Sequence, residues 1–320
     1  MISLVSPSNN IFFNLAAEEY FLKNFTENIA FFYINTPCVV VGKHQNALAE
    51  SNYAYLQENN IPLARRLSGG GTVFHDAGNI NFSFIRNFTE SAKSVDFRSF
   101  LNPVMDFLHS VEVPAEYSDR NDLLVEGKKF SGNAEHVHQQ GKRTLHHGTI
   151  LFNSELDKLG VAITNKDKNY THKAVASVRS KVANIASYLK ENLEVYPFTE
   201  RIMNHFLEKE GAEHYTFTKE DLGKIEQLVK EKFDTWEWNI GYSPKYRLDA
   251  DFEQNGGVYS IHTSVLKGVM DTCEIKRDSK AMDLSKCLEG ERLEWNSILK
   301  LVQDKTMDPE LAKNLTQRLF

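Results

Sequence analysis

The sequence predicts an α+β fold arranged as two domains. Its 320 residues exceed the length of a typical single domain. In the first 244 residues, stretches with strand-like alternation are interspersed with stretches of helical spacing. From residue 245 onward the order changes, with strands first and a helix afterwards. We therefore predict a larger domain at residues 1–244 and a small α+β domain at residues 245–320.

The chain is expected to begin with a helix at residues 14–22. Apolar residues recur there at helical spacing behind Asn14, a suitable N-cap. Two short strands follow at residues 30–34 and 38–41, separated by a turn. Residues 50–59 are typical of a short helix that ends before a proline.

The middle of the larger domain is expected to consist mainly of strands. Residues 79–85 predict a half-buried strand, because apolar and polar side chains alternate. Residues 97–111 predict an amphipathic helix, since their apolar side chains gather on one side. Residues 115–152 indicate several strands joined by turns, one of which contains residues 139–142.

Helices and a last group of strands are expected in the remainder of the chain. Residues 187–191, 199–209 and 218–233 predict helices, the last with Thr218 as its cap. Residues 241–244 indicate a linker. The small domain then shows strands over residues 246–273, which turn at Gly256-Gly257, and a helix over residues 284–301.

Composition restricts the class of protein. A net charge of −6 and a pI near 6.0 argue against general binding of nucleic acid. No apolar run approaches the ~20 residues of a membrane span, and the first residues lack the pattern of a secretory signal. The three cysteines are odd in number and far apart, which favours reduced thiols in a cytoplasm over disulfides or a zinc site.

The most informative stretch is the glycine-rich segment at residues 65–76. Gly69, Gly70 and Gly71 interrupt any helix or strand and let a ligand approach bare backbone N–H groups. Arg65 and Arg66 stand directly before them. Such N–H groups beside guanidinium groups suit a phosphate or another polyanion. A glycine-rich hairpin turn with two solvated arginines is the alternative interpretation.

A second candidate is Lys129, which precedes a turn of small residues at 131–134. Small side chains let the backbone come close to a ligand and offer hydrogen bonds. A lysine beside such a turn can neutralise a phosphate and polarise an acyl carbonyl. A solvated surface lysine is the alternative.

The histidines do not indicate a metal site. His146 and His147 are adjacent in an expected strand, so they point to opposite faces and do not share an ion easily. His75 and Asp76 diverge for the same reason, and a polar turn explains them equally well. Ser68 lacks the strand–Ser–helix context of an activated nucleophile.

Taken together, these segments resemble those of the bacterial lipoate–protein ligases of the two-domain type. The family's motifs are matched in order at residues 14–19, 40–46, 65–79, 129–134, 146–152 and 177–184. The resemblance implies a biotin/lipoyl-ligase-like catalytic domain, with mixed β-sheets flanked by helices. It also implies that residues 245–320 form the family's small accessory domain.

The implied activity has two steps. Lipoate's carboxylate attacks the α-phosphorus of ATP, which gives lipoyl-AMP and pyrophosphate. The lipoyl group then passes to a lysine of an apo lipoyl domain, in the E2 subunit of a 2-oxoacid dehydrogenase or in the glycine cleavage H protein. ATP with Mg²⁺ and lipoate are substrates, and no tightly bound cofactor, nucleic acid or membrane partner is expected.

The resemblance also implies roles for individual residues, with Lys129 as the catalytic residue. ATP is expected to contact Arg66, Gly71, Thr72, Val73, Phe74 and Lys129. Lipoate is expected to contact Lys129, Gly70, Ser68, His75, Gly132, Ala134, His147 and Gly148. We also expect Asp122 to contact the metal ion.

Three alternatives stay open at the level of sequence. An acyltransferase of the same fold works without ATP through a cysteine thioester, but this chain has no cysteine between Cys38 and Cys273. A biotin–protein ligase normally carries a different glycine–arginine motif. A non-catalytic protein that binds lipoate or nucleotide is disfavoured by the presence of Lys129 and Arg66.

Overall fold

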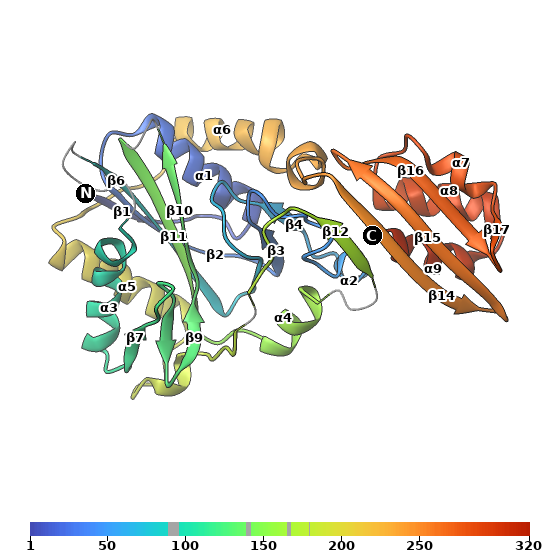
Figure 1. Ribbon diagram of the computed structural model, residues 1–320. Helices are drawn as coiled ribbons and strands as arrows, with labels where there is room; N and C mark the ends of the chain where they lie inside the picture. Colours follow the sequence, from blue (N-terminus) through green and yellow to red (C-terminus); the bar gives the residue numbers. More distant parts are fainter. Residues whose placement is uncertain (89–95, 139–141, 165–167, 179) are drawn as a thin grey trace.

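The computed structural model describes residues 1–88, 96–138, 142–164, 168–178 and 180–320 (Figure 1). Most of the turn expected at residues 139–142, and Arg179 of the 177–184 motif, lie outside the described residues. Among the described residues, no helix is both long and apolar enough to cross a membrane.

A six-stranded sheet forms the centre of the larger part of the molecule. Its strands run in the order β10-β11-β6-β2-β1-β13. The strands are β1 (Ile2–Val5), β2 (Ile29–Ile34), β6 (Asn79–Asn87), β10 (Asn133–His138), β11 (Arg143–Leu151) and β13 (Glu213–His214). Because β1 pairs in parallel with both β2 and β13 while the other pairs are antiparallel, the sheet is mixed.

Helices cover both faces of this sheet (Figure 1). On one face lie α1 (Ile11–Asn24) and α6 (Lys219–Leu228), and on the other lie α3 (Phe97–Ser110) and α5 (Val195–Lys209). The expectation of a half-buried strand at residues 79–85 is therefore wrong, because Asn79 to Ile85 of β6 are buried on both faces. Asn81 and Ser83 are accommodated by hydrogen bonds to Tyr33 and Glu18.

Two three-stranded sheets carry the segments with the strongest motifs. One has the order β4-β3-β5, with β3 (Cys38–Val41), β4 (Leu63–Arg65) and β5 (Val73–His75). The other has the order β7-β8-β9, with β7 (Ala115–Tyr117), β8 (Leu123–Val125) and β9 (Lys128–Ser131). The glycine-rich segment thus connects β4 to β5, and Lys129 lies on β9.

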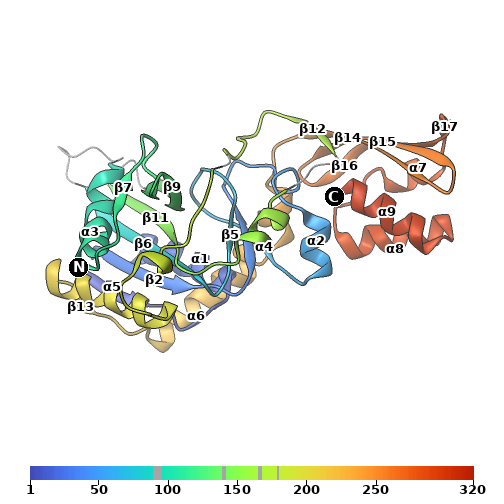
Figure 2. The same ribbon diagram turned by 90° about the horizontal axis from the view of Figure 1, so that it is seen from below.

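The C-terminal part is a five-stranded sheet with helices on one face (Figure 2). Its strands are β12 (Asn169–His172), β14 (Tyr246–Gln254), β15 (Gly257–Leu266), β16 (Val269–Arg277) and β17 (Lys280–Ala281). Its helices are α7 (Leu284–Leu288), α8 (Trp295–Thr306) and α9 (Pro309–Leu319). Because β12 pairs with β14, this sheet includes a segment from before residue 245.

Several local expectations need correction. The cap of α1 is Asn10, and Asn14 is buried inside the helix. Only the single turn η2 (Ala186–Tyr188) forms at residues 187–191, and the helix expected at 284–301 is two helices, α7 and α8. The expected cap of α6 is confirmed, since Thr218 and Asp221 form a capping box.

The remaining helical segments are short. They are α2 (Tyr53–Glu58), α4 (Leu156–Ala162), and the π-helical turns η3 (Val229–Phe233) and η4 (Glu237–Gly241). The last two lead from α6 to β14, through the segment that was expected to contain a linker.

Candidate active site

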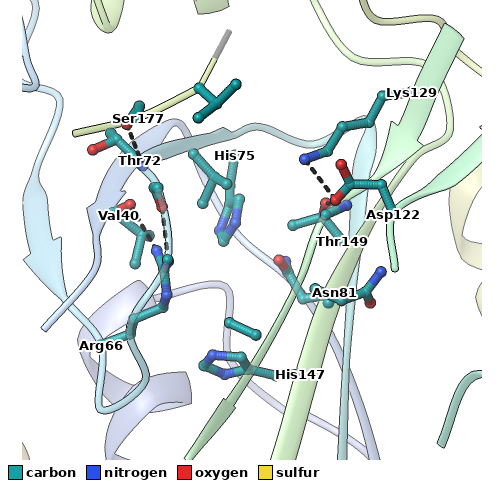
Figure 3. A pocket seen from close by; sticks show the side chains of 18 of the residues that line it. Val40, Arg66, Thr72, His75, Asn81, Asp122, Lys129, His147, Thr149 and Ser177 are labelled. Atoms are coloured by element: carbon teal, nitrogen blue, oxygen red, sulfur yellow. Dashed lines mark hydrogen bonds and ion pairs between the residues drawn. The ribbon is translucent and has the colours of Figure 1, made fainter. Parts of the chain in front are cut away.

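A cavity of about 400 Å³ lies where the glycine-rich segment faces β9, β10 and β11 (Figure 3). We call it the first cavity. Both Gly71 and Lys129 line it, although Gly71 lies in the loop between β4 and β5 and Lys129 lies on β9 of another sheet. The two strongest candidates from the sequence therefore meet at one site.

Residues 68–72, here called the glycine loop, include two glycine amides that are available to a ligand. Gly70 has a φ of +88°, which favours glycine over residues that carry a Cβ. Among the described residues, no hydrogen-bond acceptor is found for the amides of Gly70 or Gly71. The loop therefore offers N–H groups to an anionic ligand.

Arg66 shapes the glycine loop from beneath. Its Nη2 donates to the carbonyls of Gly69 at 2.6 Å and Gly71 at 2.7 Å, and its Nη1 donates to Val40 O at 3.2 Å. Its Nε donates to Ser68 Oγ at 3.0 Å. Among the described residues, these four bonds leave one N–H of the guanidinium without an acceptor, and Arg66 lines the first cavity.

Arg65 has a structural role. Its side chain is fully buried, and it donates to six acceptors at 2.8–3.1 Å, which belong to residues 42–45 and 238–243. Burial lowers the pKa of Arg65 to about 10, so the group stays charged at neutral pH. Of the two arginines predicted to lie beside a phosphate, only Arg66 lines the first cavity.

Lys129 projects from β9 into the first cavity. Its Nζ lies 2.9 Å from Asp122 Oδ1, and its side chain is 27% exposed. A Cβ at position 132 would lie 3.1 Å from both Cε and Nζ of Lys129, so Gly132 makes room for the lysine. The ammonium is thus positioned by a carboxylate yet accessible from the cavity (Figure 3).

A second cavity of about 280 Å³ adjoins the first, and Lys129 lines both. The walls that the two cavities share are Thr72, Val73, Lys129, Gly132, Thr149, Ser177, Val178 and Ser180. Away from this junction, the walls of the second cavity are mostly apolar, and the apolar residues are Phe74, Phe130, Leu151, Leu159, Ile163 and Val182. Two ligands, or two halves of one ligand, can therefore meet at Lys129.

Residues 175–178 are attached to the glycine loop through Ser177. Ser177 Oγ accepts the N–H of Thr72 at 2.9 Å and bonds to Glu50 Oε2 at 2.5 Å. Gln45 Nε2 donates to the same oxygen at 3.1 Å. The sequence interpretation assigned no role to Glu50 or Gln45, although Gln45 belongs to one of the matched motifs.

A buried relay of polar side chains supports the inner end of the first cavity. Tyr33 and Ser83 donate to the carboxylate of Glu18, and His147 Nδ1 lies 3.0 Å from it. Burial opposes ionisation, but the charge of His147 and these hydrogen bonds together hold the pKa of Glu18 below its ordinary value. Glu18 was not among the predicted site residues, although it lies in the first matched motif.

Ser68 completes this relay without being a nucleophile. Its Oγ lies 2.5 Å from His147 Nε2, which together with Glu18 resembles a Ser–His–acid triad. However, Ser68 is 1% exposed and lines neither cavity. The relay therefore connects Glu18 to Arg66 and fixes the base of the glycine loop.

His75 and His146 each bond to a partner of their own, and neither partner is shared with His147. His146 is stacked on Phe100 and bonded to Glu135 at 3.0 Å, away from His147. His75 contacts Asn35, whereas Asp76 accepts the amides of Gly78 and Glu155. Among the described residues, no group of three His, Cys, Asp or Glu side chains is arranged to hold a metal ion.

The cysteines lie outside the site. Cys38 is fully buried in β3, where burial and the charge of Asp76 raise the pKa of its thiol, and it lines neither cavity. Cys273 and Cys287 lie in the C-terminal part. A cysteine-thioester mechanism has no thiolate at this site.

Most residues predicted for the site line these cavities. The first cavity includes Arg66, Gly70, Gly71, Thr72, Val73, His75, Asp122, Lys129, Gly132, Ala134, His147 and Gly148. Phe74 lines only the second cavity, and Ser68 lies behind the glycine loop. Their contacts with particular substrates stay predictions.

A mixed sheet covered by helices, with a glycine loop opposite a lysine, defines a biotin/lipoate-ligase type of catalytic fold. Residues 10–207 match the family model described as the lipoyl protein ligase A/B catalytic domain. The chain belongs to this family.

Curated relatives agree with this assignment. The chain is 37% identical over 270 residues to lipoate-protein ligase LplJ of Bacillus subtilis, a match that covers 83% of this chain and 81% of that protein. It is 38% identical over 283 residues to lipoate–protein ligase 1 of Staphylococcus aureus, with coverages of 87% and 85%.

Two solved structures are similar in fold. Lipoate-protein ligase A bound with ATP is 25% identical with a TM-score of 0.64, and the match covers 76% of this chain and 100% of that one. A putative lipoate protein ligase from T. acidophilum with bound lipoic acid is also 25% identical, with a TM-score of 0.63 and coverages of 75% and 98%.

Proposed function

We propose that this chain is a lipoate–protein ligase that uses ATP to activate lipoate as lipoyl-AMP. In the first step an oxygen of the lipoate carboxylate bonds to the α-phosphorus, and the bond to pyrophosphate breaks. In the second step a lysine ε-amine attacks the acyl carbonyl, AMP leaves, and the amine loses its proton. The acceptor we propose is an apo lipoyl domain of a 2-oxoacid dehydrogenase or the glycine cleavage H protein.

The observation that carries the proposal is the junction of two cavities at Lys129. An acyl chain in the first cavity and a nucleoside in the second would bring the carboxylate and the α-phosphate together at this ammonium. Negative charge develops there on the phosphate and acyl oxygens, and a fixed cation stabilises it. The amides of Gly70 and Gly71 would add hydrogen bonds to the phosphate.

Further contacts follow from this arrangement. Thr72, Val73 and Phe74 would hold the nucleotide, with Arg66 beneath the glycine loop. Mg²⁺ is usually held by one or two carboxylates together with substrate phosphates, and Asp122 is the carboxylate available beside Lys129. The ion would neutralise the departing pyrophosphate.

The lipoate contacts belong to the first cavity. Gly70, Gly132, Ala134 and Gly148 would let the acyl chain lie against the backbone, and His75 and His147 would line the same cavity.

We also propose different roles for the two parts of the chain. Residues 1–244 would carry both chemical steps, and residues 245–320 would be the accessory domain. We propose a cytoplasmic location as well, since the three cysteines are free thiols.

Incubation with an apo lipoyl domain tests the function directly. We expect mass spectrometry to show a lipoylated acceptor lysine only when ATP, Mg²⁺ and lipoate are all present, together with released pyrophosphate. Modification of the acceptor from octanoyl carrier protein without ATP would instead identify an acyltransferase. Binding of lipoate or ATP without any product would identify a non-catalytic binding protein.

A further inference from the structure

A carboxylate outside both cavities holds the segment that covers their junction. Residues 175–178, here called the outer wall, contribute Ser177 and Val178 to both cavities. Because Val175 and Val178 also are 52% and 68% exposed, this segment separates the junction from solvent. Glu50 contacts the outer wall at Ser177, and it is not among the described residues that line either cavity.

The backbone fixes the orientation of the Gln45 amide beside the outer wall. Its Oε1 accepts the N–H of Gly42 at 2.8 Å and the hydroxyl of Thr72 at 2.9 Å. Because a backbone N–H can only donate, the amide oxygen must face Gly42, and the amide nitrogen faces the other way. This nitrogen, Nε2, donates to Ser177 Oγ at 3.1 Å.

These bonds leave the hydroxyl of Ser177 with a hydrogen to donate. Its Oγ accepts from Gln45 and, at 2.9 Å, from the N–H of Thr72, which together use both lone pairs (Figure 3). The hydrogen must then go to an acceptor, and Glu50 Oε2 lies 2.5 Å away. The same carboxylate accepts the N–H of Ser177 at 3.3 Å. An acceptor at position 50 therefore completes the connection between the outer wall and Thr72.

The outer wall lies close against the glycine loop at this point. A Cβ at position 71 would lie 3.2 Å from Ser177 Oγ, so Ser177 packs directly on Gly71 and Thr72. A shift of the outer wall away from these two residues would admit water to the junction of the cavities. Exclusion of water protects a reactive intermediate, such as a mixed anhydride, from hydrolysis.

We propose that Glu50 is a positioning residue, which acts through Ser177 to keep the outer wall closed over lipoyl-AMP and so limits its hydrolysis. The inference rests on the proposed function. When the wall is open, water attacks the acyl carbonyl, the bond to the phosphate oxygen breaks, and lipoate and AMP form without any modified acceptor. Loss of a hydrogen bond to a charged group should raise the open fraction about tenfold.

The lifetime of lipoyl-AMP on the protein tests the inference. With protein in excess over added lipoyl-AMP and no acceptor present, we expect AMP to form about tenfold faster with Glu50→Ala than with the wild type. Glu50→Gln should stay close to the wild type, because its amide oxygen still accepts from Ser177. Glu226→Ala, at an exposed position of α6, is the control. AMP formation at the wild-type rate in Glu50→Ala would overturn the inference.

A double substitution separates positioning through Ser177 from a general loss of structure. Ser177→Ala should accelerate AMP formation about as much as Glu50→Ala does, and the double variant should be no faster than either. Additive effects of the two substitutions would show that Glu50 does not act through Ser177.

Hydrogen exchange in the wild type keeps the test independent of the folding of variants. After correction for intrinsic rates, we expect the amide of Thr72 to exchange more slowly than those of Gly70 and Gly71, for which no acceptor is found among the described residues. Equal exchange rates would mean that Ser177 does not hold Thr72, and would overturn the inference. Absence of pyrophosphate release by the wild type with ATP and lipoate, by contrast, refutes the proposed function.

Discussion

Lys129 is the residue on which the proposed chemistry depends most. We expect Lys129→Ala to lower kcat/KM for adenylate formation by about 100-fold or more, since it removes the cation from the junction of the two cavities. Pyrophosphate release at varied concentrations of ATP and lipoate gives kcat/KM and so measures this loss.

The adjacent lysine provides a matched control for this substitution. Lys128 also lies on β9, but it is exposed and lines neither cavity. Lys128→Ala should therefore retain the wild-type rate. Equal losses in the two variants would show that the strand, and not the ammonium of Lys129, determines the rate.

Glu135 provides a test of how a single buried residue affects the stability of the protein. Burial, assisted by the charge of Asp96, raises the pKa of its carboxyl from 4.5 to about 7, and the side chain is 5% exposed. The folded protein thus binds this proton more tightly than the unfolded chain does. The contribution of the group to stability is present below pH 4.5 and is lost as the pH rises through 7.

We therefore expect Glu135→Gln to be more stable than the wild type at pH 8 by about 1–3 kcal/mol, and the advantage to shrink at pH 5. The neutral amide can still form a hydrogen bond with Nδ1 of His146, which lies 3.0 Å from the carboxyl of Glu135. Urea unfolding at the two pH values measures the difference. An advantage that does not depend on pH would contradict the assigned pKa, and Glu116→Gln on exposed β7 is the control.

At the scale of elements, the hydrogen bonds of Ser177 hold residues 175–178 against the glycine loop. Ser177→Ala removes the acceptor of the Thr72 amide and the bond to Glu50. We expect the KM for ATP to rise about tenfold, while the unfolding free energy changes by less than about 1 kcal/mol.

Pyrophosphate release at varied ATP concentration measures the effect of Ser177→Ala. Ser187→Ala is a suitable control, because Ser187 is exposed in η2 and lines neither cavity. An unchanged KM in Ser177→Ala would mean that the loop keeps its shape without this bond.

Elements with strong local signals were predicted well. Residues 30–34 and 38–41 form β2 and β3, and the Thr218 cap of α6 is present. The α9 helix was not predicted from the sequence. Asp308 caps it and Pro309 occupies its first turn, and this pair of residues is typical of the start of a helix. The extent of the helix at 187–191 was overestimated, because a short segment needs tertiary contacts to continue beyond one turn.

At the scale of the whole molecule, Arg65 connects the glycine loop to the segment that leads into the C-terminal sheet. Its six acceptors lie before β4 and in or beside η4. We expect Arg65→Lys to destabilise the protein by about 3 kcal/mol, because an ammonium cannot serve these planar contacts and leaves buried carbonyls unpaired.

Chemical unfolding monitored by tryptophan fluorescence measures this loss. Arg292→Lys is the control, since that guanidinium is 60% exposed and pairs with Glu237 at the surface. If the unfolding free energy fell by less than about 1 kcal/mol in both variants, Arg65 would not hold the glycine loop to the segment that leads into the C-terminal sheet.

The sequence by itself determined the chemistry that the chain carries and the rough order of its elements. The glycine run, Lys129 and the periodicity of strands such as β2 are local properties, and they are visible in short windows of residues. Only the tertiary structure decided which arginine faces the cavity, that β12 joins the C-terminal sheet, and that Asn35 contacts His75. The physical reason is that burial and hydrogen-bond partners depend on residues far away in the chain, as when Arg65 bonds to residues 238–243.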